Sequence, residues 1–243
     1  MAKPNRGGKR GSGGGWTPAV SAQNAKGETI DLSGSPLRYG GSVDIPDAVK
    51  TSLAAFEGVK WSSQIEYARL IAADGRVLED AKGGKTSVKT TVRAMNAADV
   101  FTHNHPRTGD VAGILGGTFS PQDVDNWANV GMRVTRAVAA EGTYSLAKLP
   151  GFDAQGVKRY YASVVRAARD RSKAAYKPYE DTYAKVAADY KRGKTDYAAV
   201  TSAYNAYIDA VVQAENRKLV EMHNALIAGQ KKYGYAYALE RRG

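Results

Sequence analysis

Two histidines separated by a single residue are the most chemically informative feature of the sequence. The chain has 243 residues and only three histidines, and two of them, His103 and His105, flank Asn104. Side chains alternate along a β-strand, so a strand here would point both imidazoles to one face, about 6–7 Å apart. Two imidazoles at that separation can converge on one cation. Because Pro106 cannot continue a strand, the pattern predicts two metal ligands at a strand end.

A carboxylate is the expected third ligand. A catalytic zinc ion takes three protein ligands and keeps one position open for water. Ser120-Pro121 is typical of a helix start, with serine at the N-cap, and this places Asp123 in the first turn. The Ser-x-x-Asp spacing is also that of a capping box, which needs no metal, and the two interpretations are compatible. Asp110 and Asp125 are alternative ligands, and Asp123 is preferred.

Hydrolysis by a metal-activated water also needs a group that carries the proton. Glu66, at the start of an expected strand, is the candidate general acid/base, and a simple charge at a strand edge is the alternative interpretation. Ser120 could donate a hydrogen bond to a developing oxyanion beside the metal. The third histidine, His223, lies far away in a helical stretch, and we predict that it is a surface or packing residue.

The surrounding sequence predicts an α/β (α+β) domain with a mixed β-sheet and flanking helices. Asp74-Gly75 between apolar runs indicates a hairpin turn, and β-branched runs indicate strands. The expected elements are a helix that starts within residues 44–47 and ends at Gly58, a hairpin over 66–78, strands over 86–92 and 99–105, a helix from Ser120 to about Val130, and strands over 133–140 and 143–147.

The chain divides into three expected regions: a flexible basic tail (1–15), a metal-binding domain (16–148) and a basic Tyr/Ala-rich helical region (149–243). Twelve of the 15 tyrosines fall in residues 151–243. Helices are predicted over 157–176, 179–191 and 197–229, with Pro178 separating the first two. The preferred interpretation is a helical hairpin or bundle with Tyr/Ala packing. The alternative is a nucleic-acid surface on which tyrosines stack bases.

Charge is concentrated at the two ends. Residues 1–10 carry a net charge of +4, residues 11–147 carry −1 and residues 148–243 carry +8, which gives +11 in total. Basic ends suit nucleic acid, an acidic surface or a solvated helix face. The chain has no cysteine, which excludes disulfides and thiolate chemistry. It also shows no apolar run of the length of a membrane span and no recognisable signal peptide.

The motif residues together resemble those of the JAB/MPN/JAMM zinc metallopeptidases. The resemblance rests on Glu66, on His103-x-His105-Pro106 and on Ser120-x-x-Asp123, and covers residues 45–148. The HNHP form is similar to the RadC-like and prokaryotic JAB branch, as in phage minor head or head-morphogenesis proteins. The resemblance implies that both histidines and Asp123 bind Zn²⁺, that Glu66 is the general acid/base, and that Ser120 assists the reaction. It also implies a cytidine-deaminase-like layering of sheet and helices.

The resemblance therefore implies a zinc-dependent hydrolase of peptide or isopeptide bonds, acting on a protein or peptide substrate. One alternative is a non-enzymatic structural or accessory protein of a phage head or virion, with phage structural proteins as partners. Another is a protein that binds or hydrolyses nucleic acid through its basic termini. The expected location is the cytoplasm of a bacterial host or the virion. Ferrous iron is a second candidate cation.

One departure from the family pattern lies next to the expected metal. Fourteen residues separate His105 from Ser120, about twice the spacing that is common in the family. The additional segment, Arg107–Thr118, is glycine-rich, and we expect a loop that covers the substrate side of the site or alters access to it.

Overall fold

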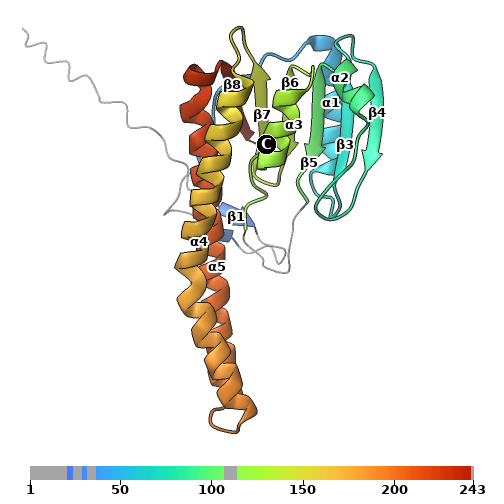
Figure 1. Cartoon of the computed structure of the whole chain (residues 1–243). Coiled ribbons are helices and arrows are strands. Elements are labelled where there is room, and N and C mark those ends of the chain that lie inside the picture. Colours follow the sequence, from blue (N-terminus) through green and yellow to red (C-terminus); the bar gives the residue numbers. More distant parts are fainter. Residues whose placement is uncertain (1–20, 24–28, 32–36, 107–113, 242–243) are drawn as a thin grey trace, which may run out of the picture.

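The computed structural model describes residues 21–23, 29–31, 37–106 and 114–241. A six-stranded mixed sheet carries helices on its faces, and a long helical hairpin extends beyond the body of the molecule (Figure 1). This architecture confirms the predicted fold class. The predicted basic tail and the alternative ligand Asp110 lie outside the described residues.

The six strands of the main sheet are β3 (Tyr67–Ile71), β4 (Val77–Lys82), β5 (Val100–Asn104), β6 (Val134–Val138), β7 (Gly142–Lys148) and β8 (Tyr235–Arg241). A separate two-stranded ribbon consists of β1 (Ser21–Gln23) and β2 (Thr29–Asp31). The helices are α1 (Asp47–Lys60), α2 (Val92–Ala97), α3 (Pro121–Asn129), α4 (Ala154–Lys191) and α5 (Tyr197–Tyr233).

One parallel strand pair determines where the histidines and the first turn of α3 meet. The sheet order is β4-β3-β5-β6-β7-β8, and every pair is antiparallel except β5 with β6. A parallel pair requires a crossover connection, and α3 lies within the segment that joins β5 to β6. The crossover brings the start of α3 to the edge at which β5 ends, so the two parts of the motif are close in space.

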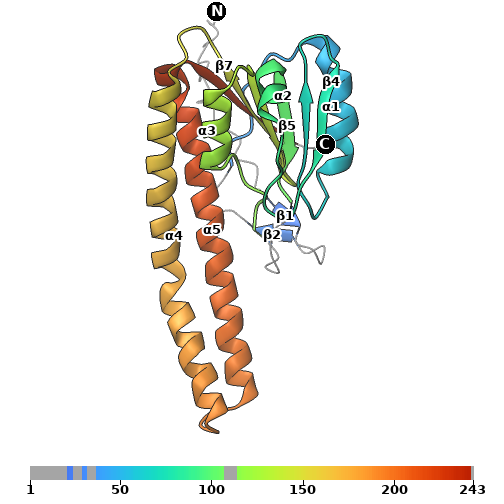
Figure 2. The ribbon, with the colours of Figure 1, turned by 45° about the vertical axis from the view of Figure 1, so that its right-hand side comes forward.

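The two faces of the sheet bury different sets of side chains. Val100 of β5 packs in a cluster with Val49 and Leu53 of α1. The next residue, Phe101, belongs to a larger cluster on the other face that includes Trp127 of α3 and Tyr161 of α4. Alternation along β5 therefore places His103 on the face of Phe101, where α2, α3 and the helical hairpin lie (Figure 2).

The prediction of a strand over residues 86–92 is wrong. These residues join no sheet, and α2 begins at Val92. The hydroxyl oxygen of Thr91 accepts a hydrogen bond from the Ala94 amide (3.3 Å), while the Glu79 carboxylate accepts hydrogen bonds from the amide and hydroxyl of Thr91. A β-branched run needs a partner strand to become part of a sheet, and here threonine caps a helix instead.

The prediction of three C-terminal helices is also wrong, whereas the helical hairpin is confirmed. Helix α4 continues through Pro178 to Lys191, and α5 runs antiparallel beside it. Tyrosines of the two helices contact each other on both sides of the proline, as in Tyr176–Tyr207 and Tyr183–Tyr204. None of the helices in the described ranges is both long and apolar enough to cross a membrane.

The chain then returns to the sheet as β8, a strand that was not predicted from the sequence. Gly234, with φ +67°, ends α5 in the left-handed conformation and reverses the chain direction. Strand β8 pairs with β7 along its full length, from Gly142 opposite Arg241 to Lys148 opposite Tyr235. The predicted boundary near residue 148 therefore runs between two parts of a single sheet.

Candidate metal centre

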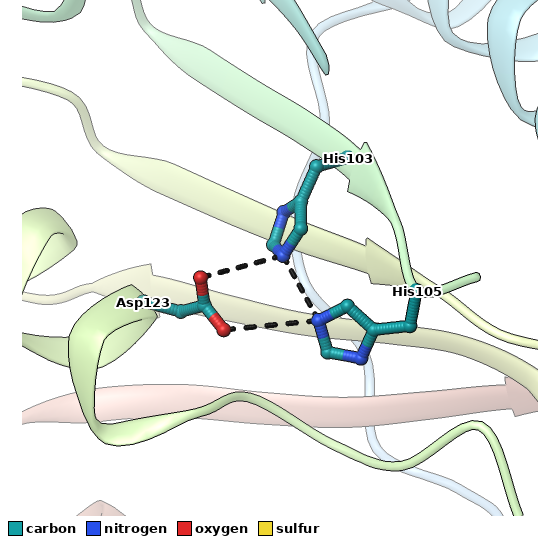
Figure 3. A group of neighbouring side chains, drawn as sticks. All are labelled: His103, His105 and Asp123. Carbon is teal, nitrogen blue, oxygen red and sulfur yellow. Dashed lines mark hydrogen bonds and ion pairs between the residues drawn. The ribbon is translucent and has the colours of Figure 1, made fainter. Parts of the chain in front are cut away.

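His103, His105 and Asp123 lie within contact of one another at the end of β5 (Figure 3). His103 is the fourth residue of β5, His105 follows the strand, and Asp123 is in the first turn of α3. The two Nε2 atoms are 3.0 Å apart. Oxygen atoms of Asp123 lie 3.4 Å from Nε2 of His103 and 3.7 Å from Nε2 of His105. All three side chains predicted as ligands are therefore brought together.

The distances between the three candidate ligand atoms suit a single small cation. Ligand atoms about 2.0–2.1 Å from a tetrahedral zinc ion lie about 3.3 Å from one another, and the three separations here are 3.0, 3.4 and 3.7 Å. Among the described residues, these three form the one group of at least three His, Cys, Asp or Glu side chains that could hold a metal ion. With these three described residues as its protein ligands, a tetrahedral ion would keep its fourth position for water, as in catalytic sites.

Asp123 caps its helix and faces the histidines at the same time. One carboxylate oxygen accepts a hydrogen bond from the Ser120 amide (2.7 Å), and the Ser120 hydroxyl oxygen accepts one from the Asp123 amide (3.2 Å). The second carboxylate oxygen is the one near His103. The capping-box and ligand interpretations are therefore compatible, and the cap holds the carboxylate in a single orientation.

The backbone of the loop before α3 sets the orientation of His105. Its Nδ1 atom lies 3.0 Å from the carbonyl oxygen of Gly117. A carbonyl can only accept, so Nδ1 carries a proton, and in the neutral imidazole the lone pair of Nε2 points into the centre. The buried Nδ1 of His103 has no hydrogen-bond partner among the described residues. Both imidazoles present Nε2 to the same point, as ligation requires.

The site attracts a positive charge. Burial alone would raise the pKa of the Asp123 carboxyl, but hydrogen bonding and attraction from His103 and His105 hold it well below the usual 3.8. Burial lowers the pKa of His105, yet the carboxylate of Asp123 and the Gly117 carbonyl outweigh burial and raise the pKa above 6.5. Asp123 is therefore ionised in this site, and its negative charge favours a proton on His105 or, in place of that proton, a bound cation.

Glu66 lies beside this group without belonging to it. Ala68 of β3 pairs with His103 of β5, so Glu66, two residues before Ala68, is on the same face of the sheet as the histidines. It is 9% exposed. Burial raises the pKa of its carboxyl; the two histidines oppose this effect, and Asp123 reinforces it. The residue predicted as general acid/base therefore lies within electrostatic range of the candidate ligands.

Asn104, between the two histidines, has a positioning role that was not predicted from the sequence. Its side chain projects to the opposite face, where Oδ1 accepts a hydrogen bond from the Tyr67 amide (2.7 Å) and Nδ2 donates one to the Ile65 carbonyl (3.0 Å). These bonds hold the backbone on both sides of Glu66. An amide residue between two ligands on the alternate face was the available signal, but its partners lie 37 and 39 residues away.

Three other residues considered for the site, Ser120, Asp125 and His223, lie outside the group of three candidate ligands. Ser120 is partly buried at the start of α3, and its hydroxyl proton is available to donate because the oxygen accepts from Asp123. Asp125 forms an ion pair with Lys158 (2.9 Å) instead of joining the group. His223 is buried and hydrogen-bonded to Tyr237, which confirms its packing role and excludes a surface position.

Comparisons with protein-family models, with curated proteins and with solved structures find no match for this chain. The resemblance to JAB/MPN/JAMM metallopeptidases therefore depends on the motif residues, and the geometry of the site is the basis for a functional hypothesis.

Proposed function

We propose that the protein is a zinc-dependent hydrolase that cleaves peptide or isopeptide bonds. The observation that carries this proposal is the convergence of His103, His105 and Asp123, with ligand-atom separations of 3.0–3.7 Å. Two neutral nitrogens and one carboxylate are a donor set that zinc prefers. A bound zinc ion would lower the pKa of a water molecule in the fourth position and polarise a carbonyl group.

The three ligands found among the described residues favour a catalytic over a purely structural metal. Structural zinc sites are closed by four protein ligands, whereas catalytic sites use three. His103 is 1% exposed at the side chain, while His105 and Asp123 are each 17% exposed. The centre is thus covered on the His103 side, and the exposed parts of His105 and Asp123 support access from the other side.

In this proposal, Glu66 and Ser120 handle the proton and the developing charge. A carboxyl whose pKa is raised by burial is closer to neutral pH and so is better suited to accept and return a proton. Asn104 holds the backbone on both sides of Glu66, which keeps the carboxylate near the centre. The Ser120 hydroxyl can donate a hydrogen bond to an oxyanion on the substrate carbonyl.

The decisive experiment combines metal analysis with Glu66→Gln. We expect about one zinc ion per chain in the wild type and in this variant, and a loss of the ion in His103→Ala. With a library of quenched fluorescent peptides that includes lysine-linked isopeptides, we expect Glu66→Gln to be about 10²–10⁴-fold slower than wild type, the usual contribution of general acid/base catalysis.

Chelation followed by addition of Zn²⁺ serves as the control and should abolish and then restore cleavage. The proposal fails if the wild type, with both histidines intact, binds no zinc. Zinc binding without any cleavage would instead favour the structural or accessory role.

A further inference from the structure

We propose that Glu141 is a positioning residue for the second histidine ligand, acting through the backbone of Gly116 and Gly117. This inference rests on the proposed metal centre. Glu141 lies immediately before β7, 36 positions after His105 in the chain, and the sequence gives no motif that includes it.

Glu141 contacts the loop that precedes α3. Its two carboxylate oxygens accept hydrogen bonds from two successive amides, Gly116 (3.0 Å) and Gly117 (2.9 Å). The Tyr144 hydroxyl donates a further hydrogen bond to the same carboxylate (2.7 Å) and so fixes its orientation. Hydrogen bonds from backbone amides to a carboxylate are stronger than those between neutral groups.

The same loop contacts the candidate metal ligand His105. The carbonyl of Gly117 accepts the Nδ1 proton of His105, and this bond determines which ring nitrogen faces the cation. Glu141 therefore holds the amide side of the same residue whose carbonyl orients the imidazole. If the turn rotated, the carbonyl would leave His105 and both imidazole tautomers would be populated.

Positions 116 and 117 of this loop both require glycine. Gly117 has φ +86°, a conformation that L side chains rarely adopt, and an added Cβ would lie 2.9 Å from Leu219 of α5. An added Cβ at Gly116 would lie 2.7 Å from the Cβ of Ala139. The glycine pair therefore allows the backbone to pass between Glu141 and the helical hairpin.

The other side of the loop is held by the C-terminal elements. The Leu115 amide donates to Oδ1 of Asn216 in α5 (2.9 Å), and the Tyr161 hydroxyl of α4 donates to the Phe119 carbonyl (2.5 Å). Between these two ends, Tyr237 contacts Thr118 (3.1 Å) and Glu141 holds the amide of Gly117, the residue whose carbonyl meets His105.

The test is Glu141→Gln, which keeps the shape of the side chain. The glutamine oxygen can accept one loop amide, but its NH₂ group would face the second amide, so one donor loses its partner. We expect the affinity for Zn²⁺, and for Co²⁺ as a spectroscopic probe, to fall about 10–100-fold. Circular dichroism and the unfolding temperature show whether the fold is retained.

A second readout reports on orientation directly. In the metal-free wild type, at a pH at which His105 is neutral, ¹⁵N NMR of the histidine side chains should show His105 protonated at Nδ1 alone, and in Glu141→Gln it should show a mixture of tautomers. Tyr144→Phe, which removes only the bond that orients Glu141, should give a smaller loss of affinity and decides the matter if the glutamine variant does not fold. Glu79→Gln is the matched control, because Glu79 also accepts a backbone amide but at Thr91.

The outcomes separate the two proposals. If the wild type binds no metal, the proposed centre is wrong. If the wild type binds metal and both Glu141→Gln and Tyr144→Phe bind it equally well, with His105 still protonated at Nδ1, then the centre stands and the positioning role of Glu141 is overturned.

Discussion

At the scale of single residues, the site depends on side chains that each satisfy two requirements. Asp123 completes a capping box and faces two imidazoles. Asn104 occupies the alternate face of the strand that carries the histidines and holds the backbone around Glu66. Such residues leave little freedom for the ligands, so a metal ion would find its coordination sphere largely formed.

Asp123→Asn should separate the two tasks of this residue. An asparagine oxygen can still accept the Ser120 amide and keep the helix cap, but the negative charge near the histidines is lost. We expect zinc affinity to fall by at least about 100-fold, more than the usual cost of losing an outer contact to a ligand. Isothermal titration of the metal-free protein with Zn²⁺ measures the change.

Asp125→Asn is the matched control, because Asp125 lies on the same helix and pairs with Lys158. Its zinc affinity should equal that of the wild type. A loss of affinity in Asp125→Asn with none in Asp123→Asn would transfer the ligand role to Asp125.

At the scale of the elements, α4 illustrates how packing overrides a local preference. Pro178 lacks an amide proton and crowds the preceding turn, which commonly ends a helix. Here tyrosine pairs across the hairpin, Tyr176–Tyr207 before the proline and Tyr183–Tyr204 after it, hold α4 against α5. The Thr182 hydroxyl donates to the Pro178 carbonyl (2.8 Å) in the turn that follows the proline.

Pro178→Ala should therefore stabilise the hairpin without affecting the metal centre. The variant restores one helical hydrogen bond and removes a steric clash, which together cost up to about 3 kcal/mol. We expect slower hydrogen exchange of amides near residues 174–182 and unchanged zinc affinity. Lys185→Ala, at another exposed position of α4, is the control and should change stability by less than about 0.5 kcal/mol. Equal or faster exchange in Pro178→Ala would contradict the expectation.

At the scale of the whole molecule, the helical hairpin and the sheet form a single structure. His223 of α5 is central to their contact: Nε2 donates to the Arg38 carbonyl (2.9 Å), and Nδ1 accepts from the hydroxyl of Tyr237 in β8 (2.7 Å). Tyr237 also contacts Thr118 in the loop before α3 (3.1 Å). These contacts connect the C-terminal elements to the loop that orients His105.

The stability of this arrangement should depend on the charge of His223. Burial lowers the pKa of His223 from 6.5 to about 4, so the unfolded chain binds a proton in a range where the folded chain does not. The stabilisation is fully present above pH 6.5, and about 3 kcal/mol is lost as the pH falls from 6.5 to 4.

Urea unfolding of the wild type and His223→Gln at pH 7 and pH 5 measures this effect. We expect the wild type to lose about 2 kcal/mol more than the variant between the two values, because glutamine can retain the hydrogen bonds but does not titrate. Equal losses in the two proteins would show that protonation of His223 does not control stability.

The sequence by itself determined the local chemistry and many of the elements. Strand alternation placed His103 and His105 on one face, and Ser120-Pro121 correctly predicted the start of α3 with Asp123 in its first turn. The hairpin around Asp74-Gly75 and the strands near 134–138 and 142–148 were also predictable. These features depend on periodicity, capping and turn preferences, which act over a few residues and can be recognised in one segment.

Only the tertiary structure decided what these segments meet. The end of β5 lies beside α3 because β5 and β6 are parallel, and Ala68 lies opposite His103 because of the register of β3. The partner of the Gly116–Gly117 turn, Glu141, and the return of residues 235–241 to the sheet are contacts between distant segments. Such contacts depend on which surfaces are buried together when the whole chain packs, and a single sequence carries no local signal for them.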